Sequence, residues 1–162
     1  MRTLWVVLVS LLSVAIARAA QPRPDAVPAD TIITLQRGGC EKRCAVYKIM
    51  LFADGTLIYD GQYYVRKDGV VSTKVDVTAI KTLVDEFRTA GYFTMQSQYG
   101  YDNTTGCQSV RSDAPVAISS ISTGGVAKSV IHHRRCVEPA LDRLTQLEDK
   151  IDKVANSGRW IK

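Results

Sequence analysis

The chain has 162 residues, of which 46% are hydrophobic and 23% are charged, and its formal net charge at neutral pH is +5. This length suits one domain with a sizeable core rather than several domains. The basic residues are scattered in short clusters, which is typical of a solvated surface and argues against a nucleic-acid-binding stripe. We therefore expect no nucleic-acid partner.

The amino-terminal residues have the form of a secretory signal peptide. A short basic start precedes an apolar run from Leu4 to Ala17, and Ala17-Arg18-Ala19 places small residues where a signal peptidase cleaves. The run is shorter than the roughly 20 apolar residues of a spanning helix, which favours cleavage over a retained anchor. We expect a signal peptide over 1–19, a flexible linker over 20–30 and no transmembrane segment after cleavage. The mature protein is then exported, either periplasmic or secreted.

Alternating apolar residues predict strands through the first half of the mature chain. Residues 32–35 and 45–53 are strand candidates, and Asp54-Gly55 predicts a two-residue hairpin turn that sets Leu51 opposite Ile58. Residues 57–59 form the returning strand. Residues 63–65 and 70–75 predict a further hairpin, and residues 115–123 and 126–133 predict a third around Gly124-Gly125.

Two segments have the period of a helix. Ile80, Leu83, Val84 and Phe87 share one helical face, with Asp76 or Thr78 as the N-cap and Gly91 as the stop. A second helix is expected from Pro139 to Gly158, after which Trp160-Ile161 folds back onto the core. Its apolar stripe consists of Leu141, Leu144, Leu147, Ile151 and Val154.

The order of strands, helix, hairpin and helix predicts an α+β fold. We expect an antiparallel β-sheet of about five to six strands with two helices packed on one face. Residues 31–162 form this single domain. Leu83, Phe87, Leu144 and Ile151 are expected to share the core between helices and sheet.

Four cysteines allow three disulfide pairings. A tight turn after Gly38-Gly39 brings Cys40 within reach of Cys44, and a loop that doubles back brings Cys107 to Cys136 across the open end of the last hairpin. We expect these two disulfides, in keeping with an oxidising compartment. Zinc binding and redox chemistry are the less favoured alternatives, because the spacing fits neither pattern. No metal and no cofactor are expected.

The segment from Gln96 to Ala114 lacks a clear period, and loops of this length are often functional. It holds tyrosines and polar groups typical of binding surfaces. The alternative is a scaffold role, with the loop pinned by Cys107 and Asp113 paired to Arg134 or Arg135. The candidate binding residues are Tyr99, Tyr101, Asp102, Arg111 and Asp113.

Catalytic chemistry has less support in the sequence. His132 and His133 are adjacent on an expected strand, so their side chains point to opposite faces, and no catalytic motif accompanies them. We expect a non-catalytic, envelope-associated module that binds a protein, a glycan or a small ligand. The alternative is a small periplasmic hydrolase that uses Asp102 or Asp113 with one of the histidines.

Several motifs follow one another in an order that is found in a known family. They are Cys40, Cys44, Val46-Tyr47, Asp54-Gly55, Tyr59-Asp60-Gly61, Leu83, Phe87, Tyr99, Asp113 and Trp160-Ile161. In this order they resemble a family of small, mostly bacterial exported domains catalogued as domain of unknown function 6438, and the resemblance extends from about residue 33 to residue 161. Ala45 replaces the family's usual proline, and the residues between the first two cysteines lack its usual glycine. The resemblance implies the fold and an exported location but no activity.

Overall fold

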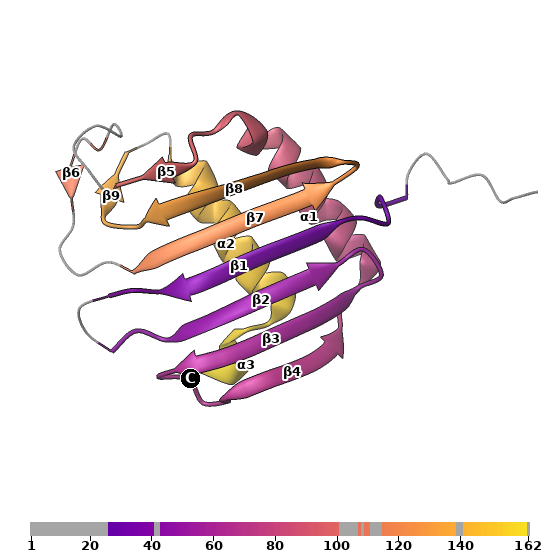
Figure 1. Cartoon of the computed structure of the whole chain (residues 1–162), viewed down its shortest axis with the longest axis horizontal. Coiled ribbons are helices and arrows are strands. Elements are labelled where there is room, and N and C mark those ends of the chain that lie inside the picture. Colours follow the sequence, from indigo (N-terminus) through magenta and orange to yellow (C-terminus); the bar gives the residue numbers. More distant parts are fainter. Residues whose placement is uncertain are drawn as a thin grey trace, which may run out of the picture.

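The structure is a computed structural model that describes residues 26–40, 43–100, 107, 109–110, 115–138 and 141–161. Figure 1 shows its elements in chain order. They are β1 (Ile32–Gly38), β2 (Val46–Phe52), β3 (Thr56–Tyr63), β4 (Gly69–Lys74), α1 (Val77–Thr89), η1 (Tyr92–Thr94), β5 (Gln98–Tyr99), β6 (Ser109–Val110), β7 (Val116–Thr123), β8 (Val126–His133), β9 (Cys136–Val137), α2 (Asp142–Ala155) and α3 (Gly158–Ile161).

The predicted α+β class is confirmed, but the predicted number of strands is wrong. Within the described residues the main sheet has seven strands in the order β4-β3-β2-β1-β7-β8-β5, and β6 and β9 form a separate pair. All neighbours in the main sheet are antiparallel except β5, which is parallel to β8. Because β5 has two residues, it is too short to produce a sequence pattern.

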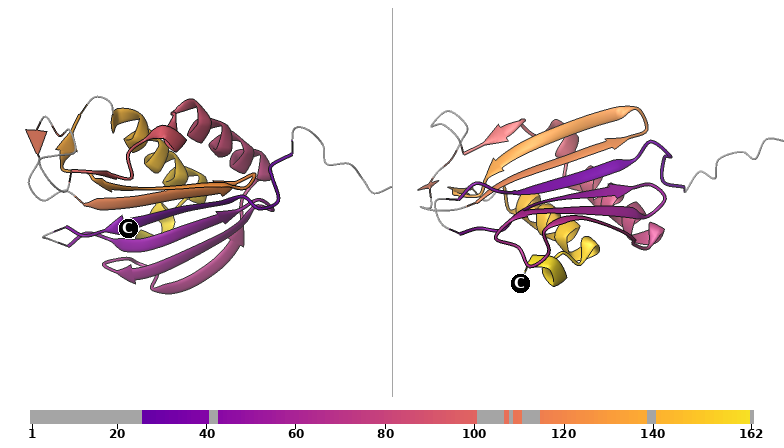
Figure 2. Two further views of the ribbon diagram at one scale, coloured as in Figure 1. Left: turned by 45° about the horizontal axis from the view of Figure 1, so that its top comes forward. Right: turned by 60° about the horizontal axis from the view of Figure 1, so that its bottom comes forward.

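Both main helices lie on the same side of the sheet in Figures 1 and 2. The core between the helices and the sheet contains the four residues predicted for it, since Leu83, Phe87, Leu144 and Ile151 are all fully buried. The alternation along β1 and β2 brings Ile33, Leu35, Ile49 and Leu51 to the same layer.

In the hairpin at Asp54-Gly55, the pairing of β2 with β3 is shifted by one residue from the predicted pairing. Met50 lies opposite Ile58 and Leu51 opposite Leu57, so the loop comprises three residues rather than two. The Asp54 carboxylate accepts hydrogen bonds from the Thr56 backbone N–H at 2.8 Å and from its hydroxyl at 2.9 Å. Gly55 adopts the positive φ of 78° that closes a three-residue hairpin loop. In the β7–β8 hairpin, by contrast, Thr123 lies opposite Val126 as predicted.

The residues that cap the two main helices agree with the prediction for α1 but not for α2. Asp76 is the N-cap of α1, because its side chain accepts from the Thr78 N–H, and Gly91 follows the helix with a φ of 69°. The predicted end of α2 at Gly158 is wrong. Asn156 ends the helix with a left-handed φ of 49°, a conformation that asparagine tolerates.

The predicted return of the carboxyl-terminal segment to the core is confirmed. Trp160 is 9% exposed, and its ring centroid lies 4.5 Å from that of Tyr59. Its carbonyl oxygen accepts the backbone N–H groups of Arg66 and Lys67 at 2.8 and 3.0 Å. The α3 segment therefore fastens the turn between β3 and β4.

The expected signal peptide, residues 1–19, lies outside the described residues. At the described end of the expected linker, Val27 packs against the core. The Asp30 carboxylate accepts the N–H groups of Gly124 and Gly125, which join β7 to β8, at 2.9 and 2.8 Å. In the part of the chain that the structure describes, every helix is too short or too polar to span a membrane.

Candidate functional site

A row of five residues, four of them polar, crosses five neighbouring strands at one level of the sheet. Directly opposite residues in a sheet share a face, and this row faces the helices because three of its members bond to residues of α2. The row therefore gathers an arginine, a histidine and two tyrosines on the helix side of the sheet. The register pairs Tyr47 with Arg37, Arg37 with Ala117, Ala117 with His132, and His132 with Tyr99.

Helix α2 supplies three carboxylates to this row. Arg37 Nη1 lies 3.3 Å from Glu148 Oε2, Nη2 lies 2.8 Å from Asp149 Oδ1, and Nε lies 3.0 Å from Asp152 Oδ2. The side chain of Arg37 is 7% exposed and that of Glu148 is fully buried. We call Arg37, His132, Glu148 and Asp152 the buried charge cluster, which Asp149 borders with an exposed side chain.

The electrostatics of the cluster keep Arg37 charged. Burial lowers its pKa, but the carboxylates of Asp152 and Glu148 raise it more, and the net pKa lies above its ordinary value. A buried cation is tolerated only where such partners surround it. Removal of one carboxylate therefore leaves the guanidinium with fewer partners in a medium that solvates it poorly.

Tyr47 extends the cluster on the β2 side. Its hydroxyl donates to Asp152 Oδ1 at 2.7 Å, and the Ser157 hydroxyl donates to the same oxygen at 2.7 Å. Burial raises the pKa of Tyr47 well above its ordinary value of 10.0, and the neighbouring Asp152 carboxylate adds to the increase. Tyr47 is therefore a neutral donor that holds Asp152 in place.

The two histidines occupy opposite faces, as predicted. His132 is 1% exposed, and its Nδ1 lies 3.0 Å from Glu148 Oε1, whereas His133 is half-buried on the other face. An imidazole oriented by a carboxylate is an arrangement used in acid–base catalysis. The Nε2 atom of His132 is buried and has no hydrogen-bond partner among the described residues.

Of the predicted binding residues, only Tyr99 lies within the described part of the chain. It is half-buried and packs against the core, and its hydroxyl oxygen accepts the Gln96 N–H at 3.0 Å. Tyr101, Asp102, Arg111 and Asp113 lie outside the described residues. The row thus includes one of the predicted binding residues, Tyr99. Its contacts hold the beginning of the predicted Gln96 to Ala114 segment against the sheet.

Both predicted disulfides are present. Cys40 bonds to Cys44 with a Cα–Cα distance of 5.9 Å, and Cys107 bonds to Cys136 with a distance of 5.2 Å. A Cβ on Gly100 would lie 2.9 Å from the Cys136 Cβ, so only glycine permits this close approach. The first bridge follows β1 and the second reaches β9, and these strands end on the same side of the sheet in Figure 1.

Of the buried charge cluster and Asp149, which borders it, only His132 was a candidate in the sequence. Arg37, Glu148, Asp149 and Asp152 were not predicted, although Arg37 and Glu148 each leave a signal in the sequence. Arg37 continues the inward alternation of Ile33 and Leu35, so period two places it in the core. Glu148 interrupts the apolar stripe of α2 one turn after Leu144. A charged residue on a buried helical face requires a partner, and these two residues are 111 positions apart in sequence.

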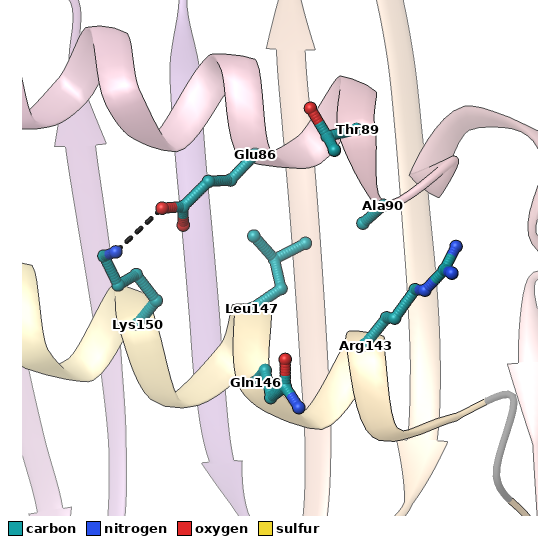
Figure 3. A pocket seen from close by; sticks show the side chains of 7 residues that line it. All are labelled: Glu86, Thr89, Ala90, Arg143, Gln146, Leu147 and Lys150. Atoms are coloured by element: carbon teal, nitrogen blue, oxygen red, sulfur yellow. Dashed lines mark hydrogen bonds and ion pairs between the residues drawn. The ribbon is translucent and has the colours of Figure 1, made fainter.

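A surface groove lies between α1 and α2 (Figure 3), with a volume of about 660 Å³. Leu147 lies between the two helices, and the Lys150 Nζ to Glu86 Oε1 contact of 2.7 Å joins the helices at one end. Arg143 lies at the other end of the groove, beside Ala90. Within the described residues, no group of three or more His, Cys, Asp or Glu side chains is arranged to hold a metal ion.

Comparison with protein families matches residues 31–155 to the family described as domain of unknown function, DUF6438. The match covers most of the chain, and the chain belongs to this family. A search of curated proteins gives no match.

Proposed function

We propose that this protein is an exported, disulfide-braced domain that binds a protein, a glycan or a small ligand of the cell envelope and performs no catalysis. One observation supports the non-catalytic part of the proposal. The groups suited to acid–base chemistry, His132 and Glu148, bond to each other in a sealed interior. An active site requires such groups to reach a substrate.

The proposed ligand surface is the segment after Tyr99, with Tyr101, Asp102, Arg111 and Asp113 as contact residues. Support comes from the described residues at the start of this segment and at Cys107. Tyr99 is fixed by the sheet register and by Gln96, and Cys107 is tied to Cys136. A restrained segment loses less entropy on binding than a free one.

Capture from a cell-envelope extract, with the mature domain as bait, tests the surface. Tyr101→Ala combined with Asp102→Ala is expected to abolish capture without changing the melting temperature. Tyr99 is left intact because it packs against the core. The matched control is Lys81→Ala combined with Asp85→Ala, a pair on the exposed face of α1. Undiminished capture by the loop variant would place the ligand elsewhere.

Export is tested separately. The expected signal peptide at 1–19 and the two disulfides are compatible with a periplasmic or secreted location. Fractionation followed by amino-terminal sequencing of the mature form is expected to find Ala20 as the first residue. A cytosolic protein with free thiols contradicts the proposal. Hydrolytic activity that Glu148→Gln abolishes contradicts its non-catalytic part.

A further inference from the structure

The two edges of the main sheet differ in the residues that they expose to another strand. At one edge, the two residues of β5 pair only with Ile131 and His132 of β8. The part of β8 that β5 leaves uncovered carries a charged residue, Lys128, within the strand, which hinders edge-to-edge pairing. At the other edge, β4 has six residues and only β3 as a strand partner among the described residues. An unpaired strand edge presents backbone N–H and C=O groups that can pair with another chain.

Strand β4 lacks the usual devices that block such pairing. It contains no proline, and the irregularity in the sheet falls between Val46 and Tyr47 rather than in β4. Its only charged residue, Lys74, stands at its end and is engaged by Asp54 at 2.8 Å. Val70 is 69% exposed. The edge therefore offers a backbone and an apolar side chain suited to strand addition.

The turn before β4 adds aromatic and basic groups. Tyr63 and Tyr64 are 66% and 63% exposed, and Tyr64 has an uncommon positive φ of 52°. The side chains of Arg66 and Lys67 are exposed, and so is that of Asp68, which follows them. The backbone N–H groups of Arg66 and Lys67 are meanwhile fixed to the Trp160 carbonyl. The turn therefore presents two basic side chains and one acidic side chain, a net charge of +1, from a backbone that is bonded to the carboxyl-terminal segment.

We propose that β4 accepts an extended, acidic segment of a partner protein as an eighth strand. Backbone hydrogen bonds to β4 supply affinity, and alternate side chains of the added strand lie beside Val70 on one face and Val71 on the other. Carboxylates at one end of the segment pair with Arg66 and Lys67, which sets its direction. This surface is separate from the segment after Tyr99, and the two proposals are tested through different residues.

The test uses a fluorescent peptide of about eight residues that alternates valine with glutamate, together with a counterpart that carries lysine in place of glutamate. The glutamate peptide is expected to bind, to slow amide hydrogen exchange in β4, and to bind more weakly as salt rises. Equal binding of both peptides, or protection confined to β5, overturns the proposal.

A second experiment reverses the charges of the turn before β4. Arg66→Glu combined with Lys67→Glu is expected to weaken binding about tenfold or more, because both rim charges become repulsive. These side chains make no contact that holds the fold, and the backbone bonds to Trp160 remain. Arg143→Glu combined with Lys153→Glu on the exposed face of α2 changes the net charge equally and is expected to leave binding unchanged. If the protein alone forms a dimer with β4 protected, the occupant is a second copy and the acidic-segment proposal is wrong.

Discussion

Helices α1 and α2 cover the same sheet by different physical means. α1 contacts the sheet through apolar side chains, including the fully buried Leu83 and Phe87, whereas α2 adds Glu148 and Asp152 to its apolar stripe. Hydrophobic burial has no preferred direction, but hydrogen-bonded ion pairs do. The comparison indicates that α1 is held on the sheet mainly by its buried apolar area. The ion pairs with Arg37 also fix the rotation of α2 about its axis and its position along that axis.

The largest expected effect tests the apolar side of this comparison. Phe87→Ala should cost about 3–5 kcal/mol of unfolding free energy, because it removes a fully buried ring and leaves a cavity. The ring packs edge-on against Tyr92 with centroids 4.6 Å apart. Chemical denaturation measures the loss, with the exposed Thr82→Ala as control. A change as small as that of the control would mean that α1 is not held by its apolar face.

Glu148→Gln tests the charged side. The amide retains the shape of the side chain but removes the charge that faces Arg37 and His132, and the expected cost is about 1.5–3 kcal/mol. Asp149→Asn is the matched control, because Asp149 also bonds to Arg37 but its side chain is 56% exposed, and solvent should reduce its cost to below about 1 kcal/mol. Equal effects would show that burial of the cluster contributes nothing.

A smaller difference is expected at the helix starts. Asp76→Ala should destabilise the protein by about 1 kcal/mol, since the Thr78 N–H loses its acceptor. At the start of α2, Leu141 provides no side-chain cap, so Asp142→Ala should have only the weaker effect of a charge near a helix dipole. Thermal unfolding of the two variants makes the comparison. The reverse order would contradict the capping role of Asp76.

The smallest expected effect is the pH dependence of stability that arises from His133. This residue lies on the face of the sheet opposite to α2. Burial lowers its pKa from the ordinary 6.5, and Arg135 and His132 lower it further. The neutral ring is favoured in the folded state, so its contribution to stability is present above pH 6.5 and decreases as pH falls through the lowered pKa. A ring-proton NMR titration should show a midpoint below 6.5, with His133→Gln identifying the signal. A midpoint above 6.5 would contradict this direction.

Much of the fold could be predicted from local patterns. The helical face of Ile80 to Phe87 and the two-residue turn of the β7–β8 hairpin followed from local patterns, and both disulfides followed from the predicted turns together with the expected compartment. The Asp54-Gly55 register did not, because the Asp54 side chain bonds to Thr56 and so lengthens the loop. Asn156 likewise ends α2 two residues before the glycine that the sequence offered.

The candidate site was harder to predict because its parts are distant in sequence. Arg37 and Asp152 are 115 positions apart, and each residue taken alone resembles an ordinary surface charge. Only the combination of period two in β1 and period 3.6 in α2 places both on buried faces. Pairing the two elements requires the order of the strands, which local patterns do not contain.

The central position of β1 has a consequence for how the chain folds. One neighbour, β2, follows within a few residues, but the other, β7, begins at Val116. When the chain is synthesised from its amino terminus, the β1–β2–β3–β4 meander can therefore form early. At that stage β1 is an edge strand, and Arg37 has no contact with the carboxylates of α2. Contacts between distant segments form slowly. The arrival of β7 and α2 then completes the sheet and neutralises its buried cation, so the amino-terminal half depends on the last part of the chain for its final state.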